Sequence, residues 1–209
     1  MNKAIIGKKL GMSQLFTEDG KFIPVTVVEA GPCPVVQVKT KERDGYEAVQ
    51  VAFGEIKEKN VNEPLKGHFK KAGVSAKRYL KELKLEGAAQ ITVGSLILCS
   101  VFTVGDHVDV TAKTKGRGFS GVIQRWNSAR GPMGHGSGYH RGVGSLSANS
   151  DPSRVFKNKH MAGQYGNEQV TIQNLEIAKI DAARNLLFIK GAVPGPKGGM
   201  VVVKESIKA

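Results

Sequence analysis

Cysteine is scarce in this chain, since only Cys33 and Cys99 occur among its 209 residues. Two residues so far apart form neither a disulfide framework nor a Cys-x-x-Cys zinc site. We expect both to be small buried side chains in a reducing compartment. Long apolar runs are also missing. The longest, residues 96–104, is too short to span a bilayer, and the first residues lack the apolar stretch of a secretory signal. A soluble cytoplasmic protein with no membrane contact is therefore expected.

Aromatic and acidic residues are few as well. Aromatic residues make up 6% of the chain, so an aliphatic core is expected. The 18 acidic residues are outnumbered by 31 Lys and Arg residues, which leaves a formal net charge of +13. Such an excess costs folding free energy through self-repulsion, and binding to a polyanion compensates for that cost. The alternative is a merely soluble basic surface, and the distribution of the charge decides between the two.

No set of catalytic or metal-ligating residues emerges from the sequence. Acidic residues are scattered through the predicted strands, so no acid–base pair can be named. His135 and His140 have no Cys or carboxylate at the spacing of a metal site. Residues 116–121 match G-x-G-x-x-G, but the next acid, Asp151, lies thirty residues beyond and no βαβ unit follows. We expect no enzyme activity, no metal, no cofactor and no small-molecule substrate.

Short strands and tight turns dominate both ends of the chain. Asp19-Gly20 and Asp44-Gly45 indicate two hairpins, because Asp-Gly supplies the positive φ angles of hairpin turns. Gly31-Pro32 and Pro34 are expected to break the ladder between them. The predicted strands are 12–16, 22–28, 35–39, 46–53, 96–102, 107–111, 170–180, 186–190 and 200–204. Many short strands with a turn about every ten residues favour a mainly β fold, a barrel or a closed sandwich.

An insertion of about residues 60–90 has a different texture. Asn62 and Gly73 are expected to cap a short helix over 64–72. Residues 77–85 alternate like a strand but are too few for periodicity to decide. In the preceding strand Val49, Val51 and Phe53 are expected to form a single apolar face.

Residues 113–161 are of another kind. They hold nine Lys and Arg residues against one acid, so that +8 of the total +13 lies in 49 residues, together with nine glycines. The segment also has few apolar side chains, and these cannot bury enough surface to offset the entropy of ordering it. We expect it to be extended and poorly ordered when the protein is alone.

This segment predicts RNA binding. Arg side chains bind phosphates bidentately, aromatic rings stack on unpaired bases, and Gly allows close approach to the backbone. A flexible linker is the alternative, but Gly-rich linkers usually carry Ser rather than positive charge. Trp126 and His140 are candidates for stacking, and for Trp126 packing at the base of the loop is an equal alternative. Affinity should fall steeply with salt.

Several motifs in order resemble one family, the bacterial form of large-subunit ribosomal protein three. The motifs are Ile6-Gly-Lys-Lys-Leu-Gly-Met12, Phe16-Thr-Glu-Asp-Gly20, Gly67-His-Phe69, Thr114-Lys-Gly-Arg-Gly-Phe119, Gln124-Arg-Trp-Asn127, Lys159-His-Met-Ala-Gly-Gln164 and Asn185-Leu-Leu-Phe-Ile-Lys-Gly-Ala-Val-Pro-Gly195. The resemblance implies a small closed β-barrel of the type shared with translation factors, formed by residues 1–118 with 162–209. It also implies a long extended loop over 119–161 that penetrates the rRNA toward the peptidyl transferase centre.

The same resemblance implies a structural constituent of the large ribosomal subunit that binds 23S rRNA, contacts neighbouring ribosomal proteins and helps to nucleate assembly. In many bacterial members a glutamine near the loop tip is N-methylated. This chain has Ser150 there, so the modification is expected to be absent. Ser145, Leu146, Ala148 and Asn149 also differ from some members.

A sequence-tolerant, nucleoid-type DNA-binding protein is the alternative function. The residues expected to contact rRNA are Lys8, Lys9, Lys113, Lys115, Arg117, Arg125, Trp126, Arg130, His135, His140, Arg141, Asn149, Ser150, Arg154, Lys157 and Lys159.

Overall fold

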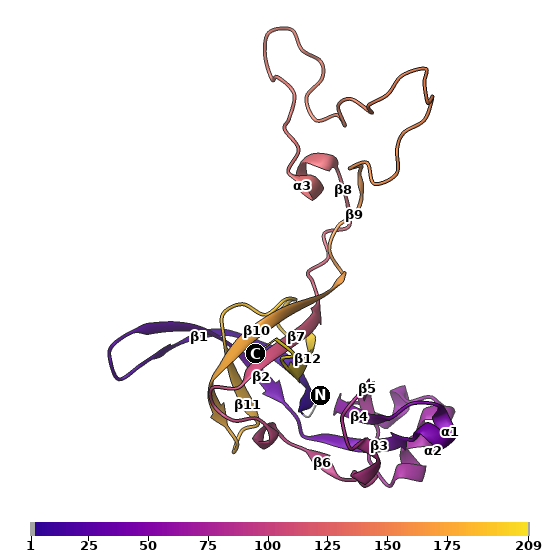
Figure 1. Cartoon of the computed structure of the whole chain (residues 1–209), viewed down its shortest axis with the longest axis vertical. Coiled ribbons are helices and arrows are strands. Elements are labelled where there is room, and N and C mark those ends of the chain that lie inside the picture. The colour runs from indigo at the N-terminus through magenta and orange to yellow at the C-terminus, as the bar shows by residue number, and fades with distance from the viewer. Residues whose placement is uncertain (1–2, 209) are drawn as a thin grey trace. The chain divides into compact units, whose positions relative to one another are not determined.

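The computed structural model describes residues 3–208, which divide into two compact units. The first unit, which we call the body, contains residues 3–113 and 169–208. The second, which we call the basic unit, is Thr114–Glu168. Figure 1 shows the ribbon of both units, coloured by residue number. None of the helices in this part of the chain is long and apolar enough to cross a membrane.

A closed antiparallel barrel of six strands forms the centre of the body, and the predicted fold class is confirmed. In order around the barrel the strands are β1 (Ala4–Phe16), β12 (Met200–Glu205), β7 (His107–Lys113), β10 (Gln169–Asp181), β11 (Leu186–Lys190) and β2 (Phe22–Ala30). β12 from the C-terminal end lies between β1 and β7. The chain therefore leaves the barrel at the end of β7 and returns at the start of β10, and the basic unit is inserted between these two paired strands.

The chain between β2 and β7 forms a second sheet of the body. Its order is β5 (Lys77–Leu83), β4 (Ala48–Glu55), β3 (Cys33–Lys39) and β6 (Leu96–Ile97). The helices of this region are α1 (Lys41–Asp44), α2 (Glu63–Ala72) and the short 3-10 helices Glu58–Asn60, Ala88–Gln90 and Cys99–Val101. This sheet begins at Cys33, well before the insertion expected at residue 60.

One core joins the barrel and the second sheet. Ile5, Val28 and Ile189 from the barrel belong to the same buried cluster as Val49 and Leu83 from the second sheet. The core is almost entirely aliphatic, as the low aromatic content predicted. Its aliphatic side chains supply the hydrophobic free energy that stabilises the body.

The second face of β4 corrects the prediction of a single apolar face. Ala52 points away from Val49 and Val51 yet is fully buried. It packs with Val36 and with Phe69 of α2 in a separate small cluster. Helix α2 therefore covers the face of β4 opposite the predicted apolar face.

Local predictions had mixed outcomes. The helix with caps at Asn62 and Gly73 is confirmed, although the Asn62 side chain makes no capping bond. Asp44-Gly45 does not form a two-residue hairpin turn, because α1 occupies the connection and Gly45 ends it in the left-handed region. Pro34 does not break a ladder but lies inside β3, opposite Leu96.

The apolar run 96–102 was wrongly predicted to be one strand. Only Leu96–Ile97 is extended, and Cys99–Val101 forms a 3-10 helix. Its buried side chains, Cys99 and Phe102, are three residues apart, which fits the three-residue turn of a 3-10 helix.

Both cysteines are buried and free, as expected. The Cys33 thiol donates to the backbone oxygen of Ile6 at 3.3 Å. Burial raises the pKa of Cys33 to about 11, so its thiol stays protonated and unreactive at neutral pH.

Candidate nucleic-acid interface

The two ends of the basic unit form an antiparallel stem, which we define as residues 114–126 and 160–168. The amide of Thr114 donates to the Glu168 oxygen at 2.9 Å, and the amide of Arg117 donates to the Tyr165 oxygen at 2.8 Å. Further along, β8 (Phe119–Ser120) pairs with β9 (Gly163–Gln164). The stem therefore holds the two ends of a long loop side by side.

Trp126 closes the stem. It ends the short helix α3 (Val122–Trp126), and its ring stacks on His160 from the other segment, with centroids 4.1 Å apart and an interplanar angle of 3°. Trp126 Nε1 donates to the Met161 oxygen at 3.0 Å, and an Arg125 guanidinium nitrogen donates to the same oxygen at 3.1 Å. For Trp126 these contacts support packing at the base of the loop. The ring remains 41% exposed.

Beyond this closure lies the tip, residues 127–159, which contains turns and one isolated bridge but no helix or strand. Part of it folds around Tyr139. The Tyr139 hydroxyl accepts a hydrogen bond from the Gly144 amide. At Gly142 a Cβ would overlap the Tyr139 ring, so a larger residue there would displace the ring. Backbone and side chain of His140 are also engaged, since its oxygen accepts from the Gly131 amide and Nδ1 donates to the Pro132 oxygen at 3.0 Å.

The positive charges of the basic unit are not neutralised within the protein. The unit holds eight Lys and Arg residues and two acids, Asp151 and Glu168. Among residues 3–208, each ion pair in the structure joins residues of the body, and none includes a cation of the basic unit. The six exposed cations are Lys115, Arg117, Arg130, Arg141, Arg154 and Lys157, and the two half-buried ones are Arg125 and Lys159. Solvated, unpaired cations at this density are suited to phosphate binding.

Some of these cations are positioned by neighbouring side chains. The Arg117 guanidinium lies 5.4 Å from the Tyr165 ring centroid, and that of Arg154 lies 5.5 Å from Phe156. Lys159 donates to the Ser147 hydroxyl at 3.4 Å. Such contacts restrict a side chain without removing its charge.

The other predicted residues have different surroundings. Asn149 and Ser150 are exposed beside the bridge between Asn149 and Pro152, and His135 is exposed in the tip. Lys8 and Lys113 are exposed on barrel strands. Lys9 is half-buried, and its ammonium donates to the backbone oxygens of Val193 at 2.6 Å and Gly195 at 3.1 Å. Lys9 thus anchors the segment before β12.

Two exposed aromatic rings of the basic unit were not among the residues predicted from the sequence. Phe119 is 81% exposed although it lies in β8, and Phe156 is half exposed in the tip. Exposed rings among unpaired cations are the combination that stacks on unpaired bases. Their position beside Gly118 and Lys157 in the same basic stretch was a signal available in the sequence.

A second group of cations was also missed. Residues 56–81 hold eight Lys and Arg residues against two acids, a net charge of +6 in 26 residues. Together with residues 113–161 they account for more than the whole net charge, so the remaining 134 residues carry a net charge of −1. The excess positive charge is therefore confined to two segments of the sequence and is not spread evenly along the chain.

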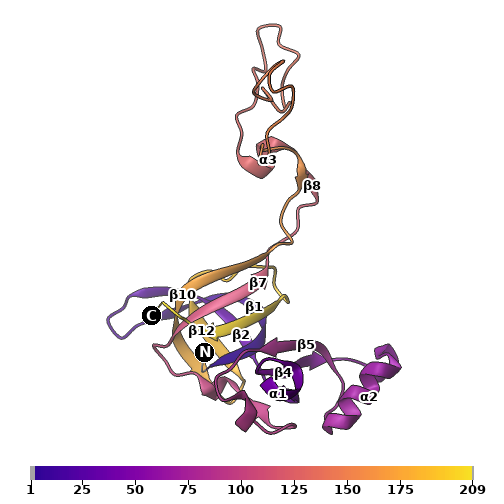
Figure 2. The ribbon, with the colours of Figure 1, turned by 45° about the vertical axis from the view of Figure 1, so that its right-hand side comes forward.

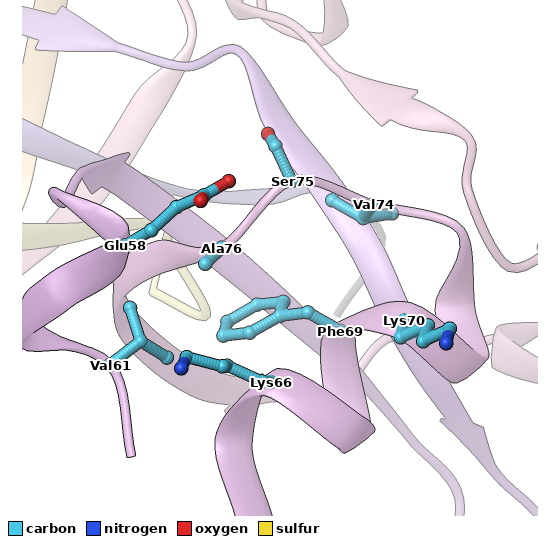
Figure 3. Close-up of a pocket in the computed structure, with 8 residues that line it drawn as sticks. All are labelled: Glu58, Val61, Lys66, Phe69, Lys70, Val74, Ser75 and Ala76. Carbon is cyan, nitrogen blue, oxygen red and sulfur yellow. The ribbon is translucent and has the colours of Figure 1, made fainter. Parts of the chain in front are cut away.

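Six of these cations border hollows in this part of the body, three of them on helix α2 itself. Lys66 and Lys70 border a hollow of about 350 Å³ whose apolar wall includes Phe69, as Figure 3 shows. A second hollow is bordered by Lys57, Lys59 and Arg78. A third is bordered by Arg43, His68 and Lys71. We call these eight residues the α2 surface. Lys66 pairs with Glu63 at 2.5 Å, and the other Lys and Arg residues of this surface form no ion pair within residues 3–208.

The unpaired cations and exposed rings of the basic unit fit a nucleic-acid-binding protein. Among residues 3–208 there is no group of three His, Cys, Asp or Glu side chains able to hold a metal ion. The family model described as ribosomal protein L3 matches residues 82–185, about half of the chain and all of the basic unit. Members of this family are structural, ribosome-associated proteins that bind rRNA together with other ribosomal proteins, and they are not enzymes. With its closed barrel, its inserted basic unit and this match, the chain belongs to the ribosomal protein L3 family.

Proposed function

We propose that this chain is a structural constituent of the large ribosomal subunit and that it binds 23S rRNA through the basic unit. The observation that carries the proposal is the set of eight Lys and Arg residues of that unit, none of them paired with a carboxylate. A segment with this charge and so little buried apolar surface gains its ordering free energy from a polyanion.

The stem and the tip have separate roles in this proposal. The stem is fixed by backbone hydrogen bonds and by the stacking of Trp126 on His160. The tip has no helix or strand, and its contacts are local ones such as those around Tyr139 and between Lys159 and Ser147. Arg130, Arg141 and Arg154 of the tip bind phosphates where rRNA strands converge, and the exposed rings stack on unpaired bases.

The α2 surface supplies a second rRNA contact of another kind. Its cations surround a buried Phe69, and the ring of Tyr79 is half-buried against the core. Without an aromatic platform it is suited to the phosphates of a duplex, since A-form RNA is recognised by shape and backbone contacts. The two surfaces thus differ in the form of RNA that they bind.

Membership of the family supports a finer role. We propose that the tip extends toward the peptidyl transferase centre and supplies no catalytic group, that the protein joins the cytoplasmic ribosome, and that it helps to nucleate subunit assembly. Ser150 belongs to the tip, and its hydroxyl side chain offers no amide for N-methylation.

A deletion tests this division of roles. Removing residues 127–159 and joining Trp126 to His160 through a short Gly linker retains the stem contacts. We expect the circular dichroism and melting behaviour of the barrel to be preserved, and incorporation into large subunits to be impaired. Loss of all β structure would refute the independence of the body, and normal incorporation would refute the role of the tip.

Competition binding distinguishes rRNA from DNA as the ligand. Fragments of 23S rRNA and duplex DNA of equal length are compared over a salt series. Preference for the rRNA fragments at every salt concentration supports the proposal, and equal affinity supports the nucleoid-type alternative.

A further inference from the structure

The β1–β2 hairpin continues beyond the barrel as a two-stranded ribbon. β1 pairs with β12 only through Ala4–Lys8, and β2 pairs with β11 only through Val25–Glu29. Residues 11–16 and 22–24 pair within the hairpin alone. We call residues 11–24 the ribbon, and Figures 1 and 2 both show it extending from the barrel of the body.

One face of the ribbon is apolar and exposed. Alternate residues of a strand share a face, and so do residues paired across two strands. One side of the ribbon therefore holds Met12, Gln14 and Phe16 of β1 together with Pro24 and Phe22 of β2. Met12 is 57% exposed, Phe16 68% and Phe22 56%. The two Phe rings meet edge to face with centroids 6.1 Å apart. Leu15 and Ile23, on the opposite face, are only half exposed.

Such a surface is unusual for a part of a chain that stands in water alone. Isolated two-stranded ribbons are marginally stable, and a third layer is normally needed to support them. Contiguous exposed apolar side chains mark interaction sites on soluble proteins. The edge-to-face ring pair is already organised for contact, so little side-chain entropy is lost when a partner covers it.

The charge of the ribbon excludes RNA as the favoured occupant. Its turn carries Glu18 and Asp19 against a single cation, Lys21. The ribbon, residues 11–24, therefore carries a net charge of −1, whereas the chain as a whole carries +13. Carboxylates beside the rings repel phosphates and attract Lys and Arg. The complementary occupant is a protein with an apolar groove whose rim is basic.

We propose that the exposed face of the ribbon docks into an apolar, basic-rimmed groove on a neighbouring protein of the large subunit. This inference rests on the proposed function, because subunit membership places other rRNA-binding proteins beside this chain, and such proteins carry basic surfaces. The Phe pair fills the groove, and Glu18 with Asp19 contacts its rim. The ribbon is then a protein-binding element, and the two basic regions bind RNA.

Photocrosslinking in assembled subunits tests the proposal. Gln14 lies between the apolar side chains on the exposed face and is itself exposed, so it is replaced by p-benzoylphenylalanine. We expect an adduct with one other ribosomal protein at a peptide that contains apolar and Lys or Arg residues. An adduct with rRNA, or no protein adduct, would overturn the proposal. The same group in place of Ser13, on the opposite face, is the matched control and should give a lower yield.

Two surface variants test the two parts of the contact. Phe16→Ser with Phe22→Ser removes the rings, and Glu18→Lys with Asp19→Lys reverses the charge of the turn. Each should lower the adduct yield at Gln14 at least fivefold, while the isolated protein keeps its affinity for 23S rRNA fragments. If either pair lowered rRNA affinity instead, the ribbon would be an RNA contact and this inference would fail, although the proposed function would stand. If the unmodified chain did not enter large subunits, the proposed function itself would fail.

Discussion

Neutralising the tip gives the most quantitative prediction. The variant replaces Arg130, Arg141, Arg154, Lys157 and Lys159 with Gln, which removes every Lys and Arg between residues 127 and 159. None of the five is in an ion pair with a carboxylate, so their loss leaves no unpaired acid in the protein. Its effect should therefore appear in RNA binding and not in folding.

The expected magnitude follows from counterion release. If each of the five cations neutralises one phosphate, the slope of log K against log salt should become shallower by roughly 3.5 to 4.5, at about 0.7 to 0.9 per phosphate. Between about 50 and 200 mM salt the unmodified protein should then lose roughly 100- to 500-fold more affinity than the variant.

Fluorescence anisotropy with labelled 23S rRNA fragments measures both slopes. The matched control replaces five exposed cations of the body that lie outside the α2 surface and form no ion pair within residues 3–208, namely Lys21, Lys84, Lys179, Lys197 and Lys208. Both variants lower the formal net charge of +13 by five, so they differ only in where the charge is removed. Equal slope changes would show that binding depends on net charge alone, and the assignment of phosphate contacts to the tip would be refuted.

Three further predictions concern the stem and the body. His160→Ala removes the ring stacked on Trp126, the only tryptophan, so tryptophan emission should become more accessible to acrylamide; unchanged quenching would mean that the stack does not form. Although burial opposes it, hydrogen bonds from Lys3 and Thr103 lower the pKa of Asp106 from 3.8 to about 2. Because the folded pKa of Asp106 is depressed, its contribution to the free energy of unfolding is complete above about pH 4 and is lost as pH falls toward 2. Denaturant unfolding of Asp106→Asn should lack this pH dependence. If the free energies of unfolding of the variant and the unmodified protein changed in parallel with pH, the assignment would be contradicted. Ile189→Ala empties a fully buried site in the barrel and should lower the free energy of unfolding by about 2–5 kcal/mol in denaturant titration, whereas a loss below about 1 kcal/mol would argue against a close-packed core.

Local patterns gave the elements, and non-local pairing determined the architecture. The strands around Ile177, Ile189 and Val203 were predictable because their alternation is a property of a few consecutive residues. The pairing of β1 with β12 joins the two ends of the chain, and no local pattern encodes it. The sequence therefore indicated a barrel or a sandwich without deciding between them.

The errors have the same origin. Ala52 was left out of the single predicted apolar face because alternation cannot reveal that Phe69, 17 residues later, packs on it. Cys99 and Phe102 were placed in a strand because a short run of apolar residues is compatible with more than one period. In both cases tertiary packing overrode a weak local preference.

The candidate site divides in a similar way. The basic unit was recognisable because charge, glycine and the shortage of apolar residues coincide in one stretch of sequence. At the α2 surface, Lys66 and Lys70 alternate with residues such as Phe69 that form a core, so the local composition resembles an ordinary folded segment. Only the fold shows that these cations gather around one helix.

Amide hydrogen exchange measures whether residues 127–159 of the tip take their order from rRNA. Exchange is measured by mass spectrometry on the free protein and on the same protein bound to a 23S rRNA fragment, with β7 and β10 as the internal reference. We expect the tip to exchange within seconds in the free protein and to be strongly protected in the complex. Slow exchange of the tip in the free protein, at the rate of the barrel strands, would contradict this role of rRNA.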